Sequence, residues 1–218
     1  MKIRQCGDSM LLVELEPVID PIVNEHAIML AARIRNRGAR GIRDVAPGYC
    51  TIGIHFDPLQ TDLGALERAI ESEYSSLSTT TVLEDRAVIE IPVRYGGDLG
   101  PDLANVARHV GCTTDEVIAR HVQRTYRVYM LGFVPGFAYM GRVDPSIAAP
   151  RHRVPREKVP AGSVGLAGLQ TGVYPVDSPG GWQLIGHTTT VMFDANREPP
   201  SLLAAGDVVR FVISGVHE

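Results

Sequence analysis

The chain has 218 residues, of which 44% are hydrophobic and 21% charged, and its formal net charge is -4 at pH 7. This composition is ordinary for a globular protein, and the length suits one large domain or two small ones. The negative charge gives no general electrostatic reason to bind nucleic acid or an anionic membrane, because both favour basic surfaces, so we expect neither partner.

The N-terminus and the cysteines exclude further classes. The first residues, MKIRQCGDSMLLVELEP, lack the apolar segment and cleavage site of a signal peptide, and no run approaches the roughly 18 apolar residues of a spanning helix. The three cysteines lie far apart without CxxC spacing, which argues against a disulfide framework and a structural zinc site. We therefore expect a cytoplasmic protein without a metal site.

The first 77 residues predict the element order ββαββα. Asp20 is a good N-cap, Pro21 is well tolerated at the first helical position and Gly38 is a natural helix end. Thr61 or Asp62 can cap the second helix. Strands are expected at 2–6, 10–15, 42–45 and 50–56. This order favours an antiparallel sheet with both helices on one face, an α+β domain over residues 1–80.

Residues 81–218 predict a mainly β domain, and the serine- and threonine-rich segment 75–81 is the expected boundary. The turn-rich corner that ends in Asp102 can cap a short helix, Thr113 can cap another, and His121 is expected at a partly buried edge of the latter. Strands are expected at 87–95, 126–133, 188–193 and 208–213. So many short strands predict a small barrel or closed sheet.

Residues 132–186 combine chain-breaking residues with aromatic ones. This segment holds 10 of the 22 glycines and 7 of the 15 prolines, together with several aromatic side chains. The aromatic residues are Phe133, Phe137, Tyr139, Tyr174 and the only tryptophan, Trp182. A flexible linker would be poor in such residues because it buries nothing, so the breakers predict turns in an ordered site.

A basic cluster lies in this segment. Its members are Arg151, His152, Arg153, Arg156 and Lys158. Arginine is suited to bidentate capture of a carboxylate or a phosphate, although a solvated basic loop is the alternative interpretation. Arg156 is the member that we favour for a functional role.

Uncharged polar groups follow the basic cluster. Gln170, Thr171 and Tyr174 precede Trp182, a combination typical of a small-molecule pocket, with a barrel corner around a core tryptophan as the alternative. His187 could take part in proton transfer or have a structural role. Residues 159–168 predict a glycine-spaced loop that matches neither a dinucleotide nor a phosphate-loop motif, so ATP chemistry would need a partner chain.

Sequence blocks in this half share one order with a known family. They are YGG at 95–97, GPD at 100–102, GFVPGFAY at 132–139, VPAGSVG at 159–165, QTGVYP at 170–175 and SPGGWQLIG at 178–186. These blocks resemble the family of 5-oxoprolinase B subunits, also known as allophanate hydrolase subunit 1 and as the Kip-type (KipI family) inhibitors of a sporulation kinase. His187 stands where many relatives have arginine.

The resemblance implies a fold, an activity and partners. It implies an N-terminal α+β domain followed by a cyclophilin-like β-barrel domain. It also implies one component of an ATP-dependent hydrolase that opens 5-oxo-L-proline to L-glutamate, a component that is inactive alone. The implied partners are a C subunit of the allophanate hydrolase subunit 2 type and an A subunit, and the implied cofactor is ATP, used through the complex.

We expect a pocket on the barrel shared with a partner chain. The expected catalytic residues are Arg156, Gln170 and His187. The expected substrate-binding residues are Phe137, Tyr139, Gly162, Thr171, Tyr174, Gly181 and Trp182. Two alternatives stay open: half of a biotin-dependent carboxyltransferase acting on urea or another amide, and a non-catalytic regulator that binds a histidine kinase.

Overall fold

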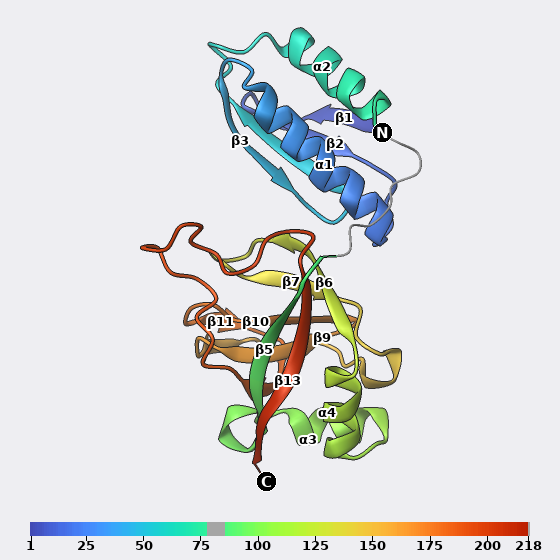
Figure 1. The fold of residues 1–218 in the computed structure, drawn as a ribbon, viewed down its shortest axis with the longest axis vertical. Coiled ribbons are helices and arrows are strands. Elements are labelled where there is room, and N and C mark those ends of the chain that lie inside the picture. Colours follow the sequence, from blue (N-terminus) through green and yellow to red (C-terminus); the bar gives the residue numbers. More distant parts are fainter. Residues whose placement is uncertain (78–85, 218) are drawn as a thin grey trace. The chain divides into compact units, whose positions relative to one another are not determined.

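The computed structural model describes residues 1–77 and 86–217 and divides the chain into two units, 1–85 and 86–218 (Figure 1). Each unit has a hydrophobic core of its own. The domain edge predicted after residue 80 lies outside the described residues and stays a prediction. No helix within the described ranges is long and apolar enough to cross a membrane.

The first unit is an antiparallel four-stranded sheet packed against two helices. The strands lie side by side in the order β1-β2-β4-β3. The bounds are β1 Lys2–Gln5, β2 Met10–Glu14, α1 Pro21–Arg37, β3 Ile42–Pro47, β4 Thr51–Phe56 and α2 Leu63–Ser75. Alternate residues of β2 and β4 are buried in one apolar cluster with residues of both helices, which confirms the predicted α+β domain.

Polar and glycine residues fix the ends of these helices as predicted. The Asp20 carboxylate accepts a hydrogen bond of 2.8 Å from the amide of Ile22, and Gly38 ends α1 in the left-handed conformation with φ 61°. Asp62 caps α2 by accepting from the amide of Ala65 at 2.9 Å. The short-range chemistry of the sequence therefore determines where α1 and α2 begin.

The second unit is a closed barrel whose strands follow the order β10-β7-β6-β13-β5-β12-β9, with β9 pairing back to β10. The bounds are β5 Val88–Gly96, β6 Thr125–Leu131, β7 Ala138–Gly141, β9 Ser163–Ala167, β10 Gln170–Val173, β12 Gln183–His187 and β13 Val208–His217. Strands β13 and β5 run parallel and the other pairs antiparallel. The predicted barrel is confirmed.

Short helices and two short strands lie outside this barrel. Figure 1 shows α3 and α4 beside the end at which β13 finishes. The bounds are η1 Gly97–Leu99, α3 Leu103–Val110, α4 Thr114–Val122, η2 Pro145–Ile147, β8 Arg156–Val159 and β11 Ser178–Gly180. Strands β8 and β11 pair with each other outside the barrel and carry part of the site.

The barrel interior contains a histidine that was predicted at a partly buried edge. That prediction is wrong, because His121 has no exposed surface. Its Nδ1 lies 2.8 Å from the Tyr95 hydroxyl, its Nε2 lies 2.9 Å from the Thr171 hydroxyl, and its ring stacks on Phe211 with 4.6 Å between centroids. The helix α4 is short, and its inner face contributes to the barrel core, where two hydroxyl groups satisfy the imidazole.

Other local predictions in this unit are also wrong. No strand covers residues 188–193: β12 ends at His187, the Thr190 amide bonds to the Thr188 hydroxyl at 3.1 Å, and Phe193 forms only an isolated bridge. Residues 159–168, predicted as a loop, include the buried strand β9, in which Gly165 leaves room for the neighbouring Trp182. The hydrogen bond to the Thr188 hydroxyl replaces strand pairing after β12. The small Gly165 allows β9 to pack closely against its neighbours.

Candidate functional site

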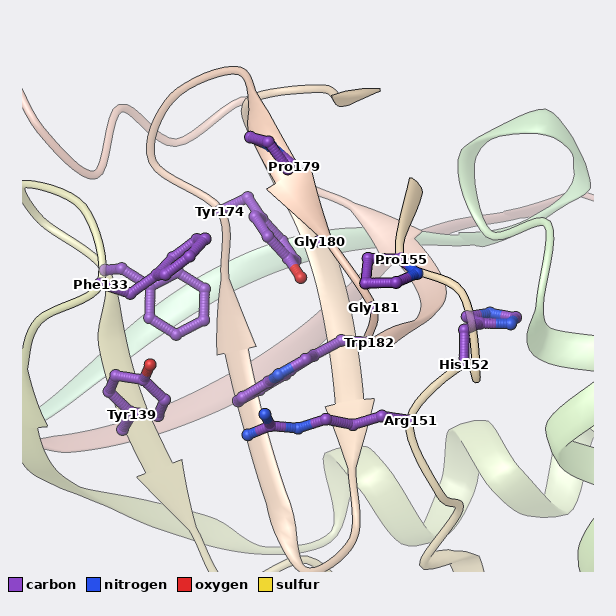
Figure 2. A pocket seen from close by; sticks show the side chains of 11 residues that line it. Phe133, Tyr139, Arg151, His152, Pro155, Tyr174, Pro179, Gly180, Gly181 and Trp182 are labelled. Carbon is purple, nitrogen blue, oxygen red and sulfur yellow. The ribbon is translucent and has the colours of Figure 1, made fainter. Parts of the chain in front are cut away.

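A pocket of about 280 Å³ opens on the second unit and is lined mainly by aromatic and glycine residues (Figure 2). Its lining residues are Phe133, Phe137, Tyr139, Arg151, His152, Pro155, Tyr174, Pro179, Gly180, Gly181 and Trp182. They come from the loop between β6 and β7, from β7, from the segment before β8, and from the stretch between β10 and β12. Largely apolar concave sites with a few polar groups are typical of small-molecule binding.

The back of the pocket is a rigid set of rings. Phe137 lies edge to face with three rings at once, at centroid distances of 4.9 Å to Tyr139, 5.3 Å to Tyr174 and 5.4 Å to Trp182. Phe137, Tyr174 and Trp182 are almost fully buried, so their rings are held by the surrounding core. Such edge-to-face packing orients each ring and leaves the wall little freedom to rearrange.

Glycine at position 180 is required by the close approach of a tyrosine. A Cβ atom there would lie 2.3 Å from the Tyr174 hydroxyl oxygen, so a side chain cannot be accommodated without displacing the ring. Burial raises the pKa of Tyr174, which keeps its hydroxyl protonated at neutral pH. The pocket therefore contains a fixed, uncharged hydroxyl group.

Phe133 forms an exposed edge of the pocket, and the sequence did not single it out as a site residue. Its ring is edge to face with Phe137 at 5.7 Å, yet the residue is 59% exposed. Its φ of 70° is unusual for a residue with a side chain, and the Val134 amide donates to the Gly132 carbonyl at 3.0 Å to close a tight turn around it. Strained backbone of this kind clusters at functional sites.

Replacing Phe133 by alanine or by glycine separates the backbone cost from the role of the ring. Both variants remove the ring, but only glycine adopts a positive φ freely, so Phe133→Gly should be more stable than Phe133→Ala by about 1 kcal/mol. Thermal unfolding of the two proteins measures this difference. Equal stabilities would show that the turn carries no strain, and equal loss of ligand affinity in both would assign binding to the ring.

A buried carboxylate holds the basic segment beside the pocket. Asp102 is 3% exposed and accepts from Arg156 Nη2 at 2.7 Å and from the Leu184 amide at 2.7 Å, while His152 Nε2 lies 3.2 Å from its Oδ2. Burial alone would raise the pKa of Asp102, but the hydrogen bonds from Arg156 and Leu184 outweigh it, so the pKa is lowered. Asp102 is thus an ionised anchor.

The contacts of Asp102 differ from those expected of a helix cap. Asp102 occupies the position before α3, as predicted for a helix cap, but its side chain makes no capping bond. It contacts Arg156, which is 54 residues further along the chain. The GPD block at 100–102 contained the signal, but nothing in the sequence identifies the partner of its carboxylate.

The predicted site residues fall into separate groups. Those that line the pocket are Phe137, Tyr139, Tyr174, Gly181 and Trp182. The three predicted catalytic residues, Arg156, Gln170 and His187, are not among its lining residues. Their roles remain predictions, since a partner chain could contribute to a larger site.

The remaining predicted residues lie on the barrel and at its rim. The buried Thr171 hydroxyl bonds to His121 inside the barrel, and half-buried Gln170 pairs with Gly141 on β7. His187 donates from Nε2 to the Ala161 carbonyl at 2.8 Å. It lies against Gly162, where φ is 85° and a Cβ atom would come within 2.7 Å of that same nitrogen. The structure thus brings His187 and Gly162 together.

Metal ligands do not gather within the described residues, where no group of three or more His, Cys, Asp or Glu side chains could hold an ion.

Comparisons with known proteins agree over almost the whole chain. A family model described as carboxyltransferase domain, subdomain C and D, matches residues 1–203. The 5-oxoprolinase B subunit of Bacillus subtilis (strain 168) is 41% identical over 221 residues, covering 97% of this chain and 92% of the relative. The 5-oxoprolinase B subunit of Escherichia coli O157:H7 is 42% identical over 207 residues, covering 94% and 93%.

Longer proteins also contain a related region. The crystal structure of TTHA0988 matches with a TM-score of 0.84 and 36% identity over 98% of this chain, which spans 41% of that chain. The urea amidolyase of Lachancea kluyveri is 26% identical over 95% of this chain but only 13% of its own length. The fold and these matches define a carboxyltransferase-type protein of subdomains C and D. The chain belongs to the family of 5-oxoprolinase B subunits.

Proposed function

We propose that this chain is the B subunit of an ATP-dependent 5-oxoprolinase, which hydrolyses 5-oxo-L-proline to L-glutamate together with a C subunit and an A subunit. The observation that carries the proposal is the 41% identity to the 5-oxoprolinase B subunit of B. subtilis over nearly the full length of both proteins. The small aromatic pocket is consistent with a compact ring as substrate.

The chemistry demands stabilisation of developing charge. The lactam amide is a poor electrophile, and transfer of a phosphoryl group from ATP to its oxygen releases ADP and activates the amide carbon. Water then adds to that carbon, the C–N bond breaks with protonation of the nitrogen, and hydrolysis of the resulting acyl phosphate releases glutamate and phosphate. In this proposal Arg156, Gln170 and His187 stabilise that charge at the interface with a partner chain. The aromatic pocket binds the ring, and because these three residues do not line it, the proposal requires a larger site, completed by the partner chain, that extends from the pocket to them.

The residues that line the pocket differ from those that usually hold ATP. Its volume is about 280 Å³, its walls are mainly aromatic, and Arg151 and His152 are the basic side chains that line it. A triphosphate is usually held by a glycine-rich backbone loop with a lysine and a magnesium ion. We therefore place ATP on a partner chain.

Reconstitution tests the function. The purified chain is expected to release no glutamate from 5-oxoproline, whereas the chain with its C and A subunits should do so only when ATP is added. Glutamate release by the isolated chain would refute the shared site. If the full complex with ATP released no glutamate, the proposed function would be wrong.

A second candidate is half of a biotin-dependent carboxyltransferase acting on urea or another amide. The description of the matching family model and the similarity to urea amidolyase favour it. Carboxyl transfer from carboxybiotin to urea by the reconstituted complex would establish this activity, and its absence alongside 5-oxoproline hydrolysis would dismiss it.

The regulatory alternative, binding to a histidine kinase without catalysis, stays a prediction. Such binding depends on exposed apolar surface, not on polar site residues. The alternative predicts that Arg156→Ala and Gln170→Ala leave the cellular phenotype intact while changes to exposed apolar residues abolish it. The enzymatic proposal predicts the opposite result.

A further inference from the structure

Arg151 stands over the wall of the pocket without a carboxylate of its own. Its Cζ atom lies 5.8 Å from the centroid of the Trp182 ring, within reach of a cation–π contact. Figure 2 shows the guanidinium extended along the indole toward Tyr139. Within the described ranges, no ion pair or hydrogen bond of Arg151 with another side chain is present, so its donors are available to a ligand.

His152, Arg156 and Lys158 differ from Arg151, because a carboxylate lies close to each of them. Asp102 engages both Arg156 and His152, and the exposed Lys158 pairs with Asp177 at 2.8 Å. Arg151 therefore supplies the positive charge that the pocket offers to a ligand. A ligand with one negative charge complements it.

The shape of the pocket defines the remainder of the ligand. Rings form most of the walls, the volume is about 280 Å³, and Tyr139 and Tyr174 each bring a hydroxyl group to these walls. A planar carboxylate matches the forked donors of an arginine better than a tetrahedral dianion, which needs more donors.

We propose that Arg151, positioned over the Trp182 ring, is the anchor for a carboxylate, and that the pocket selects small monocarboxylates with a compact ring as their body. For the identity of the natural ligand this inference rests on the proposed function, since 5-oxoproline is such a molecule. Recognition of the carboxylate itself does not depend on lactam hydrolysis.

The single tryptophan makes binding visible without catalysis. Trp182 is the only tryptophan of the chain and lines the pocket beneath Arg151. Its fluorescence in the full-length chain is titrated with 5-oxoproline, with cyclopentanecarboxylate, which lacks the lactam, with 2-pyrrolidinone, which lacks the carboxylate, and with inorganic phosphate. Arg151→Gln removes the proposed anchor. Arg153→Gln makes the same charge change two residues away, outside the pocket lining.

We expect both carboxylates to change the emission of the wild-type chain and to bind Arg151→Gln at least about 10-fold more weakly, because a hydrogen-bonded charge is lost. Arg153→Gln should bind within about twofold of wild type, since a distant exposed charge contributes little. The neutral lactam should bind weakly and equally to all three proteins. Circular dichroism and thermal unfolding verify that both variants fold.

Several results would overturn the inference. These are equal effects of the two substitutions, tighter binding of 2-pyrrolidinone or phosphate than of the carboxylates, and no change of Trp182 emission by any carboxylate at millimolar concentration. The two proposals remain distinguishable. Arg151-dependent binding of carboxylates by a chain whose full complex does not hydrolyse 5-oxoproline would refute the proposed function and leave the carboxylate site in place.

Discussion

Asp102→Asn is expected to lower the free energy of unfolding by about 2–4 kcal/mol and to weaken ligand binding at the aromatic pocket. Asparagine keeps the shape of aspartate but removes the charge that balances Arg156, and the Asp102 side chain is only 3% exposed. Arg156 is 30% exposed, so water partly compensates and the cost stays below that of a fully buried pair. Thermal unfolding and titration of Trp182 fluorescence measure both effects.

Asp177→Asn is the matched control. This carboxylate also pairs with a basic residue, Lys158, and lies near the same pair of strands, but its side chain is 52% exposed. An exposed ion pair contributes little, so the control should unfold close to wild type. If both variants unfold at the same temperature, Asp102 is not the anchor of the segment. In the double variant Asp102→Asn/Arg156→Gln, we expect a smaller loss than the sum of the single losses.

The contact between Asp102 and Arg156 could not be predicted from the sequence, whereas the first unit could. The first unit was predictable because its signals are local: Asp20 and Asp62 cap helices within three residues, and apolar residues alternate along β2 and β4. The barrel class followed from many short strands. By contrast, the contact between Asp102 and Arg156 joins residues 54 positions apart, and no local rule predicts such a pair.

Only those features of the pocket that follow from local sequence composition could be predicted. The aromatic residues of 132–186 were expected to form a pocket, and five of the predicted site residues do line one. The sequence pattern could not predict the positive φ of Phe133, because the nearby glycines at 132 and 136 are the residues expected to take a positive φ. The structure gives that conformation to Phe133 as well as to Gly136.

The interior of the barrel contains His121, whose full burial the sequence did not predict and whose hydrogen bonds determine where it carries a proton. The buried Thr171 hydroxyl donates to the Gly165 carbonyl at 3.1 Å and so accepts from His121 Nε2, which leaves Nδ1 to accept from Tyr95. This arrangement requires a neutral imidazole. Burial lowers the pKa of His121 to about 3, and burial raises the pKa values of the facing Tyr95 and Tyr126, so neither of these hydroxyl groups carries a negative charge that would stabilise a protonated ring.

The stability of the barrel should therefore fall as the pH falls below the ordinary histidine pKa. Because the pKa of His121 is about 3 in the folded protein and about 6.5 when unfolded, the unfolded chain binds the extra proton between these values. The loss begins near pH 6.5 and reaches about 2 kcal/mol at pH 5 relative to pH 8.

Denaturant unfolding from pH 8 to pH 5 measures this dependence in wild type and in two variants. His121→Gln removes the titrating ring, so its stability should be lower at pH 8 but should fall less steeply, by the missing contribution of about 2 kcal/mol at pH 5. His109→Gln removes an exposed imidazole from α3 and should keep the wild-type slope. Equal slopes for wild type and His121→Gln would contradict the assignment, because they would mean that the ring is charged in the folded barrel or that water reaches it.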